Sequence, residues 1–142
     1  MTAYKKLEDN IFISGQLFAD DLEKIKAQGF TTIICNRPDY EEDIVDQPLS
    51  NEIERQAQAL GLQFFYIPMG SQGPTQKTVQ ETRHALDEAR GPVLAYCLTG
   101  KRSVILCSQA LALSGAHSMP DLVSAAQALG YNLSLNSELI AA

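Results

Sequence analysis

The chain has 142 residues, of which 45% are hydrophobic and 20% are charged. These values are ordinary for a globular protein, and we expect residues 1–142 to form a single domain with a buried core. Asp and Glu outnumber Lys and Arg by 17 to 11, which gives a net charge of −6. An acidic chain argues against nucleic acid and anionic membranes as partners, so an anionic ligand must be held by a local feature.

The sequence carries no signal for targeting or for metal binding. Lys5 and Lys6 are followed by Leu-Glu-Asp-Asn rather than by the apolar segment of a signal peptide, and no apolar run approaches the roughly 18 residues of a membrane helix. The three cysteines, at positions 35, 97 and 107, have neither the spacing of a disulfide framework nor that of a zinc site. We therefore expect a cytoplasmic protein without a metal or another cofactor.

Short apolar runs alternate with helical patterns along the chain. In chain order, the pattern predicts a strand at 11–14, a helix at 19–29, a strand at 31–35, a helix at 50–61, a strand at 63–68, a helix at 76–91, a strand at 92–97, helices at 103–115 and 120–130, and a last short helix within 131–142. Ser50 is expected to cap the second helix. Strands that alternate with helices of about 10–15 residues predict an α/β fold, in which a mostly parallel sheet of four to five strands is flanked by helices.

The segment Cys-Leu-Thr-Gly-Lys-Arg-Ser, at residues 97–103, follows a predicted buried strand and leads into a predicted helix. Ligands of parallel sheets bind beyond the carboxyl ends of the strands, which is where this segment falls. The N–H groups of such a loop and of the first helical turn have no partners within the helix, so they attract an anion. We therefore expect the anion to be bound by the loop and the start of the helix, at Leu98, Thr99, Gly100, Lys101 and Ser103.

Cys97 and Arg102 are the candidate catalytic residues of this segment. A cysteine in an electropositive loop is favoured as the thiolate, which is the reactive form, and Arg102 can offer a planar fork to an oxyanion. Gly100 allows a positive φ or a close approach to a ligand, and Ser103 can cap the helix or hydrogen-bond the thiolate. The alternative is a core thiol, since free cysteine is among the most buried residues; the position and neighbours of Cys97 favour the nucleophile.

Several short motifs resemble one known family, and they fall in the order that the family has. They are ISGQL at 13–17, NRPDYEE at 36–42, QP at 47–48, GLQFFYIP at 61–68 and GPVLAYCLTGKRS at 91–103. Together they resemble the phosphatase-like domain found beside metallo-β-lactamase-type hydrolases in bacterial proteins. The resemblance implies the fold of dual-specificity tyrosine phosphatases, and it suggests a metallo-β-lactamase-fold hydrolase as a partner.

Members of the family that the chain resembles are described both as phosphatase-like and as sulfurtransferases. Two features of this sequence, the length of the loop and a missing acid, favour sulfur transfer over phosphate-ester hydrolysis. Four residues lie between Cys97 and Arg102, which resembles the shorter loop of rhodaneses, whereas tyrosine phosphatases have five. Residues 68–75, the loop expected to supply a phosphatase's general acid, contain no Asp or Glu. The main prediction is therefore a sulfurtransferase, in which Cys97 takes sulfur from a small sulfur-containing anion as a persulfide and passes it to a thiol acceptor.

Two alternatives to sulfur transfer stay open. One is a tyrosine-phosphatase-like hydrolase that forms a phosphocysteine and binds a phosphate-type anion through Arg102. The other is a non-catalytic anion-binding or interaction domain. Departures from the family pattern permit the second: where the family commonly has His, Arg, Ser and a small residue, this chain has Tyr96, Leu98, Thr99 and Lys101.

Two further residues belong to the strand predicted at 31–35 and to the loop after it, which should lie beside the strand that ends at Cys97. Arg37 either adds positive charge to the anion site or pairs with Asp39 or Glu41 to fix its own loop, and the tight Arg-Pro-Asp turn favours the second role. Cys35 either resolves an oxidised or persulfidated Cys97 or is a buried strand residue, and the frequent burial of cysteine favours the second.

Overall fold

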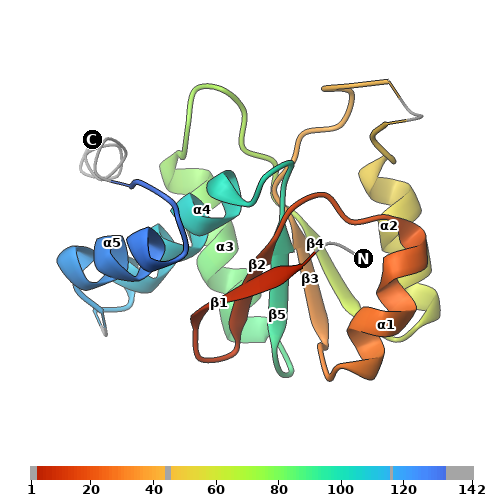
Figure 1. Ribbon diagram of the computed structural model, residues 1–142, viewed down its shortest axis with the longest axis horizontal. Coiled ribbons are helices and arrows are strands. Elements are labelled where there is room, and N and C mark those ends of the chain that lie inside the picture. The colour runs from red at the N-terminus through yellow and green to blue at the C-terminus, as the bar shows by residue number, and fades with distance from the viewer. Residues whose placement is uncertain (1–2, 44–45, 116, 134–142) are drawn as a thin grey trace.

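A five-stranded sheet forms the centre of the fold, in the order β1-β2-β5-β3-β4 (Figure 1). The computed structural model describes residues 3–43, 46–115 and 117–133. The strands are β1 (Tyr4–Glu8), β2 (Ile11–Ser14), β3 (Thr32–Cys35), β4 (Gln63–Tyr66) and β5 (Val93–Tyr96). The helices are η1 (Ala19–Asp21), α1 (Leu22–Ala27), α2 (Ser50–Ala59), α3 (Gln76–Glu88), α4 (Lys101–Leu113) and α5 (Met119–Ala128). Strands β2, β5, β3 and β4 are parallel and β1 is antiparallel, so the prediction of a mostly parallel α/β sheet is confirmed.

Helices cover both faces of the sheet, and each face has its own hydrophobic core. Helices α3, α4 and α5 lie on one side and α1 and α2 on the other (Figure 1). The core on the first side contains Ile34 and Ala95 with residues of α3, α4 and α5. The core on the second side contains Ile33 and Leu94 with residues of α1 and α2. Successive residues of one strand thus pack into opposite cores. This explains why β3 and β5 are continuous apolar runs.

The four parallel strands end at one edge of the sheet. Tyr96, the last residue of β5, is in register with Ser14 of β2 and with Cys35 of β3, and Cys35 is in register with Tyr66 of β4. The expectation that β3 lies beside the strand leading to Cys97 is therefore confirmed. Loops that follow these four strands meet at this edge, which places the 97–103 segment among them.

The structure corrects several predicted boundaries. Strand β1 was not predicted, because its Lys5 and Lys6 are exposed and it lacks a continuous apolar run, as is common for an edge strand. Ser50 does not cap α2, whose N-cap is Leu49; Ser50 is the first helical residue and binds Asp39 through its N–H and its hydroxyl. The helix predicted at 19–29 is a 3₁₀ turn followed by the short α1.

The start of α4 also differs from the prediction. Gly100 adopts a left-handed conformation and is the N-cap, so the helix begins at Lys101, two residues before the predicted start. Ser103 is therefore inside the helix and does not cap it. The last short helix predicted within 131–142 falls largely on residues 134–142, which lie outside the described residues. Within the described ranges, no helix has the length and apolar character that a membrane crossing requires.

Candidate active site

The sulfur of Cys97 accepts a hydrogen bond from the turn that follows it. Gly100 N–H donates to Cys97 Sγ across 3.1 Å. The left-handed backbone of Gly100, with φ of 98°, aims this N–H back toward the end of β5, and a non-glycine residue would be strained there. Only 1% of Cys97 is exposed. The sulfur is thus buried and is bound by a main-chain donor of the loop.

The carbonyls of the loop point away from the sulfur and are bound from outside. Gln16 N–H, in the turn after β2, donates to Leu98 O across 3.2 Å, and Val104 N–H of α4 donates to Gly100 O across 3.0 Å. An anion-binding loop needs this arrangement, because each inward N–H leaves an outward C=O that requires its own donor.

Arg102 binds the carboxylate of Glu41 through both of its terminal nitrogens. Its Nη1 and Nη2 donate to Glu41 Oε2 at 2.8 Å and to Glu41 Oε1 at 3.0 Å, and its Nη1 also donates to Met69 O at 3.1 Å. Burial acts to lower the pKa of Arg102, but the hydrogen bonds to Glu41 and the negative charge of the nearby Cys97 sulfur outweigh it and raise the pKa. The guanidinium is thus within reach of both the sulfur and an oxyanion, although only four residues separate Cys97 and Arg102.

Arg37 shares the same carboxylate. It is a large buried side chain that donates through Nε to Glu41 Oε1 at 3.0 Å and through Nη1 to Gln16 Oε1 at 2.8 Å. Two roles were predicted for Arg37, and these contacts fit the second: Arg37 pairs with Glu41 and thereby fixes the loop after β3. Arg37 nevertheless places a second guanidinium on the carboxylate that Arg102 holds.

Glu41 is held in its ionised form. The hydrogen bond to Arg102 has the largest effect and lowers the pKa of the Glu41 carboxyl. Burial opposes it, and the further hydrogen bond to Arg37 lowers the pKa again, so the pKa is lowered overall. A carboxylate with a lowered pKa holds no proton to donate at neutral pH, so Glu41 is unsuited to act as a general acid. Sequence reasoning treated it only as a possible partner of Arg37. The spacing of four residues between the two was the signal for that pair, but nothing local revealed the contact with Arg102, which is 61 positions away.

The other predicted anion-binding residues occupy different parts of the loop. Leu98 is half-exposed, and Thr99 and Lys101 are exposed, so these three form the rim. Ser103 is fully buried, and its hydroxyl has no hydrogen-bond partner among the described residues. The prediction that Ser103 caps the helix or bonds the Cys97 sulfur is therefore wrong for this structure. Because α4 begins at Lys101, Ser103 lies within the helix and not before it.

The remaining cysteines belong to the two cores. Cys35 is buried at the end of β3, where its Sγ donates to Arg37 O at 3.5 Å, and burial raises its pKa to about 11. Cys107 is buried within α4, and burial raises its pKa to about 12. Thiols held protonated in this way are poor nucleophiles, which agrees with the favoured interpretation of Cys35 as a strand residue.

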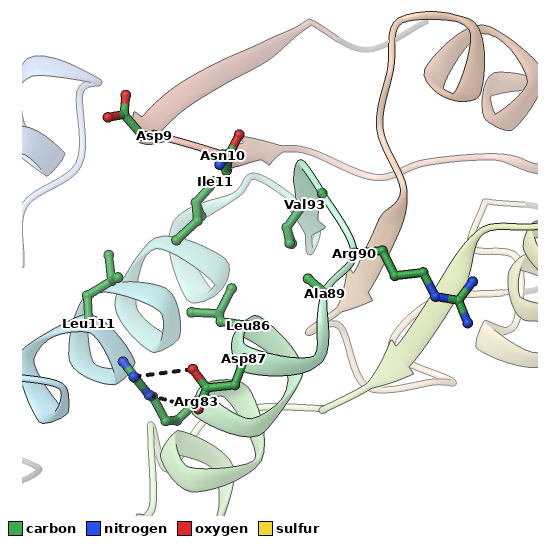
Figure 2. Close-up of a pocket in the computed structure, with 11 residues that line it drawn as sticks. Asp9, Asn10, Ile11, Arg83, Leu86, Asp87, Ala89, Arg90, Val93 and Leu111 are labelled. Atoms are coloured by element: carbon green, nitrogen blue, oxygen red, sulfur yellow. Dashed lines mark hydrogen bonds and ion pairs between the residues drawn. The ribbon is translucent and has the colours of Figure 1, made fainter.

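One hollow in the surface is lined by Tyr40, Glu41, Glu42 and Asp43, in the loop after β3. Another, of about 370 Å³, is lined by Arg83, Asp87, Arg90 and the first residues of β2 and β5, at the opposite edge of the sheet (Figure 2). It contains no cysteine, and its Arg83 is paired with Asp87. In the parts of the chain that the structure describes, no three His, Cys, Asp or Glu side chains cluster in a way that could hold a metal ion.

The class of fold follows from the comparisons with solved structures. A proposed phosphatase of Neisseria meningitidis Z2491 superimposes with a TM-score of 0.77 at 34% sequence identity, covering 92% of this chain and 90% of that one. PTPMT1 has a TM-score of 0.67 at 15% identity, over 87% of this chain and 80% of its own. The core catalytic domain of the PP-IP phosphatase SIW14 from S. cerevisiae, solved with citrate, has a TM-score of 0.60 at 19% identity, over 85% and 71%. The fold is that of the dual-specificity and tyrosine phosphatases.

The family is narrower than the fold. Residues 3–116 match the family described as "Beta-lactamase hydrolase-like protein, phosphatase-like domain". The beta-lactamase hydrolase-like protein of Agrobacterium fabrum is 30% identical over 128 residues, and that of Xylella fastidiosa strain Temecula1 is 26% identical over 127 residues. The chain thus belongs to this phosphatase-like domain family. It spans 29% of the length of these two relatives.

The comparisons favour the phosphatase alternative and give no support to the main prediction of sulfur transfer. The prediction of sulfur transfer was based on the four residues between Cys97 and Arg102 in the sequence. In the structure α4 begins at Lys101, so Arg102 lies in its first turn, where the interaction with the Cys97 sulfur helps to raise the pKa of Arg102.

Proposed function

We propose that this domain hydrolyses phosphate monoesters through a covalent phosphocysteine at Cys97. The observation that carries the proposal is the contact of Arg102 with both oxygens of the Glu41 carboxylate, beside the sulfur that accepts the Gly100 N–H. A planar guanidinium that binds two oxygens of a carboxylate can bind two oxygens of a phosphoryl group in the same way. Glu41 in this state marks the place where the phosphoryl oxygens would lie.

The proposed reaction has two displacements at phosphorus. The Cys97 thiolate attacks the phosphoryl group, the P–S bond forms, and the bond to the leaving oxygen breaks with its electron pair on that oxygen. Water then attacks the phosphocysteine, the P–S bond breaks, and inorganic phosphate leaves as the thiolate is restored. Arg102 and the loop N–H groups stabilise the charge on the phosphoryl oxygens in both steps.

The choice of leaving group follows from the acids near the site. The segment 68–75 contains no Asp or Glu, and Glu41 is held ionised. An alkoxide needs a proton as it leaves, whereas a phenolate is a much weaker base and needs less help. We therefore propose aryl phosphates, rather than alkyl phosphates, as the substrate class.

The test is hydrolysis of p-nitrophenyl phosphate, phenyl phosphate and an alkyl phosphate by the wild-type protein and by Cys97→Ser. The expected kcat/KM falls steeply in that order of leaving-group basicity, and Cys97→Ser is inactive on all three. A parallel incubation with thiosulfate, read by intact mass, tests sulfur transfer. A sulfur adduct at Cys97 without release of p-nitrophenol would overturn the proposal, as would hydrolysis that survives in Cys97→Ser.

A further inference from the structure

The peptide bond between Thr99 and Gly100 is bound at both of its polar ends. Its N–H donates to Cys97 Sγ across 3.1 Å, and its C=O accepts a hydrogen bond from Tyr131 Oη across 2.9 Å. In a planar trans peptide these two groups point in opposite directions. The Tyr131 hydroxyl and the Cys97 sulfur therefore hold the same peptide unit from opposite sides.

The glycine at position 100 also gives this peptide the freedom to turn over. Gly100 has a φ of 98°, and a glycine populates both positive and negative φ at little cost. The neighbouring carbonyls of Leu98 and Gly100 are bound by main-chain N–H groups of the turn after β2 and of α4. The donor to Thr99 O is a side chain instead, so its removal leaves that carbonyl free to rotate and to withdraw the N–H from the sulfur.

Tyr131 itself is held in place from two directions. Its N–H donates to Ala126 O at the end of α5 across 2.9 Å. Lys5 Nζ of β1 donates to Leu129 O at 2.9 Å and lies 5.5 Å from the centre of the Tyr131 ring. A Cβ atom built on Gly100 would lie 2.5 Å from Tyr131 Oη, so the hydroxyl is packed directly over the turn. Burial and the charge of Cys97 raise the pKa of Tyr131, which keeps the hydroxyl protonated as a donor.

Tyr131 lies outside the part of the chain that the family match covers, which ends at residue 116. We propose that Tyr131 is a positioning residue for the nucleophile: its hydroxyl fixes the Thr99–Gly100 peptide so that the Gly100 N–H stabilises the Cys97 thiolate. This inference rests on the proposed role of Cys97 as the nucleophile. It also gives α5 a function, since that helix and the segment after it carry the hydroxyl to the active loop.

The experiment compares Tyr131→Phe with Tyr40→Phe, which removes a hydroxyl from a side chain that is 75% exposed on the loop after β3. Alkylation of Cys97 by iodoacetamide is followed against pH, with the modified residue identified by peptide mass. We expect the midpoint of the Tyr131→Phe profile to move upward by roughly 0.5–1 pH unit, the size of one ordinary hydrogen bond, because the Gly100 N–H bond to the sulfur would be weakened rather than abolished. We expect kcat for p-nitrophenyl phosphate to fall about three- to tenfold with KM changed by less than about twofold. Tyr40→Phe should match the wild type in both.

The two readouts separate this inference from the proposed function. Alkylation needs no phosphatase activity, so a wild-type protein that hydrolyses no phosphate ester would refute the phosphatase proposal while the shift in the alkylation profile still supports Tyr131. A Tyr131→Phe protein with an unchanged alkylation midpoint and unchanged kcat would overturn the inference, whether or not its melting temperature falls. In that case the hydroxyl would serve only to attach the end of α5.

Discussion

Arginine and carboxylate side chains meet at both edges of the sheet, and they behave differently at each. Beyond the carboxyl ends of the strands, Arg37 and Arg102 converge on the Glu41 carboxylate, and Arg37 is almost wholly buried. At the opposite edge, Arg83 pairs with Asp87 one helical turn further along α3, and 58% of the Asp87 side chain is exposed (Figure 2).

The difference between the two edges shows that a hollow with charges does not define an active site. The hollow at the Arg83 edge is open and charged, but its ion pair is local to one helix and no nucleophile lies in it. At the Glu41 edge, two segments far apart in sequence, the loop after β3 and the 97–103 segment, bring two guanidinium groups to one carboxylate near a sulfur. Surface pairs of the Arg83 type stabilise a protein little, whereas a partly buried network is specific in its geometry.

The largest expected difference between the two edges is in activity, when Arg102 at one edge and Arg83 at the other are each replaced by lysine. Arg102→Lys keeps the positive charge but loses the planar fork, so we expect kcat/KM for p-nitrophenyl phosphate to fall on the order of 100-fold. Arg83→Lys, the matched change at the other edge, should leave kcat/KM within about twofold. Steady-state kinetics of both variants measure this, and equal losses in the two would break the distinction between the edges.

A smaller effect is expected on stability when each carboxylate is made neutral. Glu41 has a lowered pKa when folded, so its ionised form stabilises the protein above the ordinary carboxyl pKa, and this stabilisation is lost as pH falls through the folded pKa. We expect Glu41→Gln to lower the free energy of unfolding by about 1–2 kcal/mol at pH 7, a figure reduced for its partial exposure. The difference from the wild type should begin to shrink as the pH falls below about 4, where an ordinary Glu carboxyl takes up its proton, and should vanish only below the lower pKa of the folded carboxyl.

Asp87→Asn is the control for Glu41→Gln, and it should change the free energy of unfolding by less than about 0.5 kcal/mol at either pH. Urea unfolding at pH 7 and at pH 3 measures both variants. A Glu41→Gln protein as stable as the wild type at pH 7 would mean that the carboxylate does not hold the two arginines together in solution.

Local sequence signals were enough to predict the α/β fold and the place of Cys97 at the end of β5. The apolar runs of β3 and β5 predicted buried parallel strands, and parallel strands put the residues after them at one edge. Cys97, Gly100 and Arg102 are adjacent in sequence, so the loop could be recognised without knowing what packs around it. The charged edge strand β1 was not predicted because its apolar and polar residues do not alternate regularly.

The contacts that complete the site join positions far apart in the chain, and the sequence does not carry them. The Glu41–Arg102 pair spans 61 positions and the Tyr131–Thr99 bond spans 32. Each depends on how a loop or a helix docks, which is decided by packing of the whole domain. The prediction of sulfur transfer, which the comparisons do not support, was based on the number of residues between Cys97 and Arg102, and that number does not show where α4 begins.

The central claim is that Cys97 takes up a phosphoryl group, and trapping that intermediate tests it most directly. The wild-type protein and Cys97→Ser are mixed with excess p-nitrophenyl phosphate, quenched during turnover under conditions that preserve a phosphothioester, and analysed by intact mass and peptide mapping. We expect one added phosphoryl group on the peptide containing Cys97, and none in Cys97→Ser. Release of p-nitrophenol with no phosphoryl group on Cys97, or with one on another residue, would contradict it.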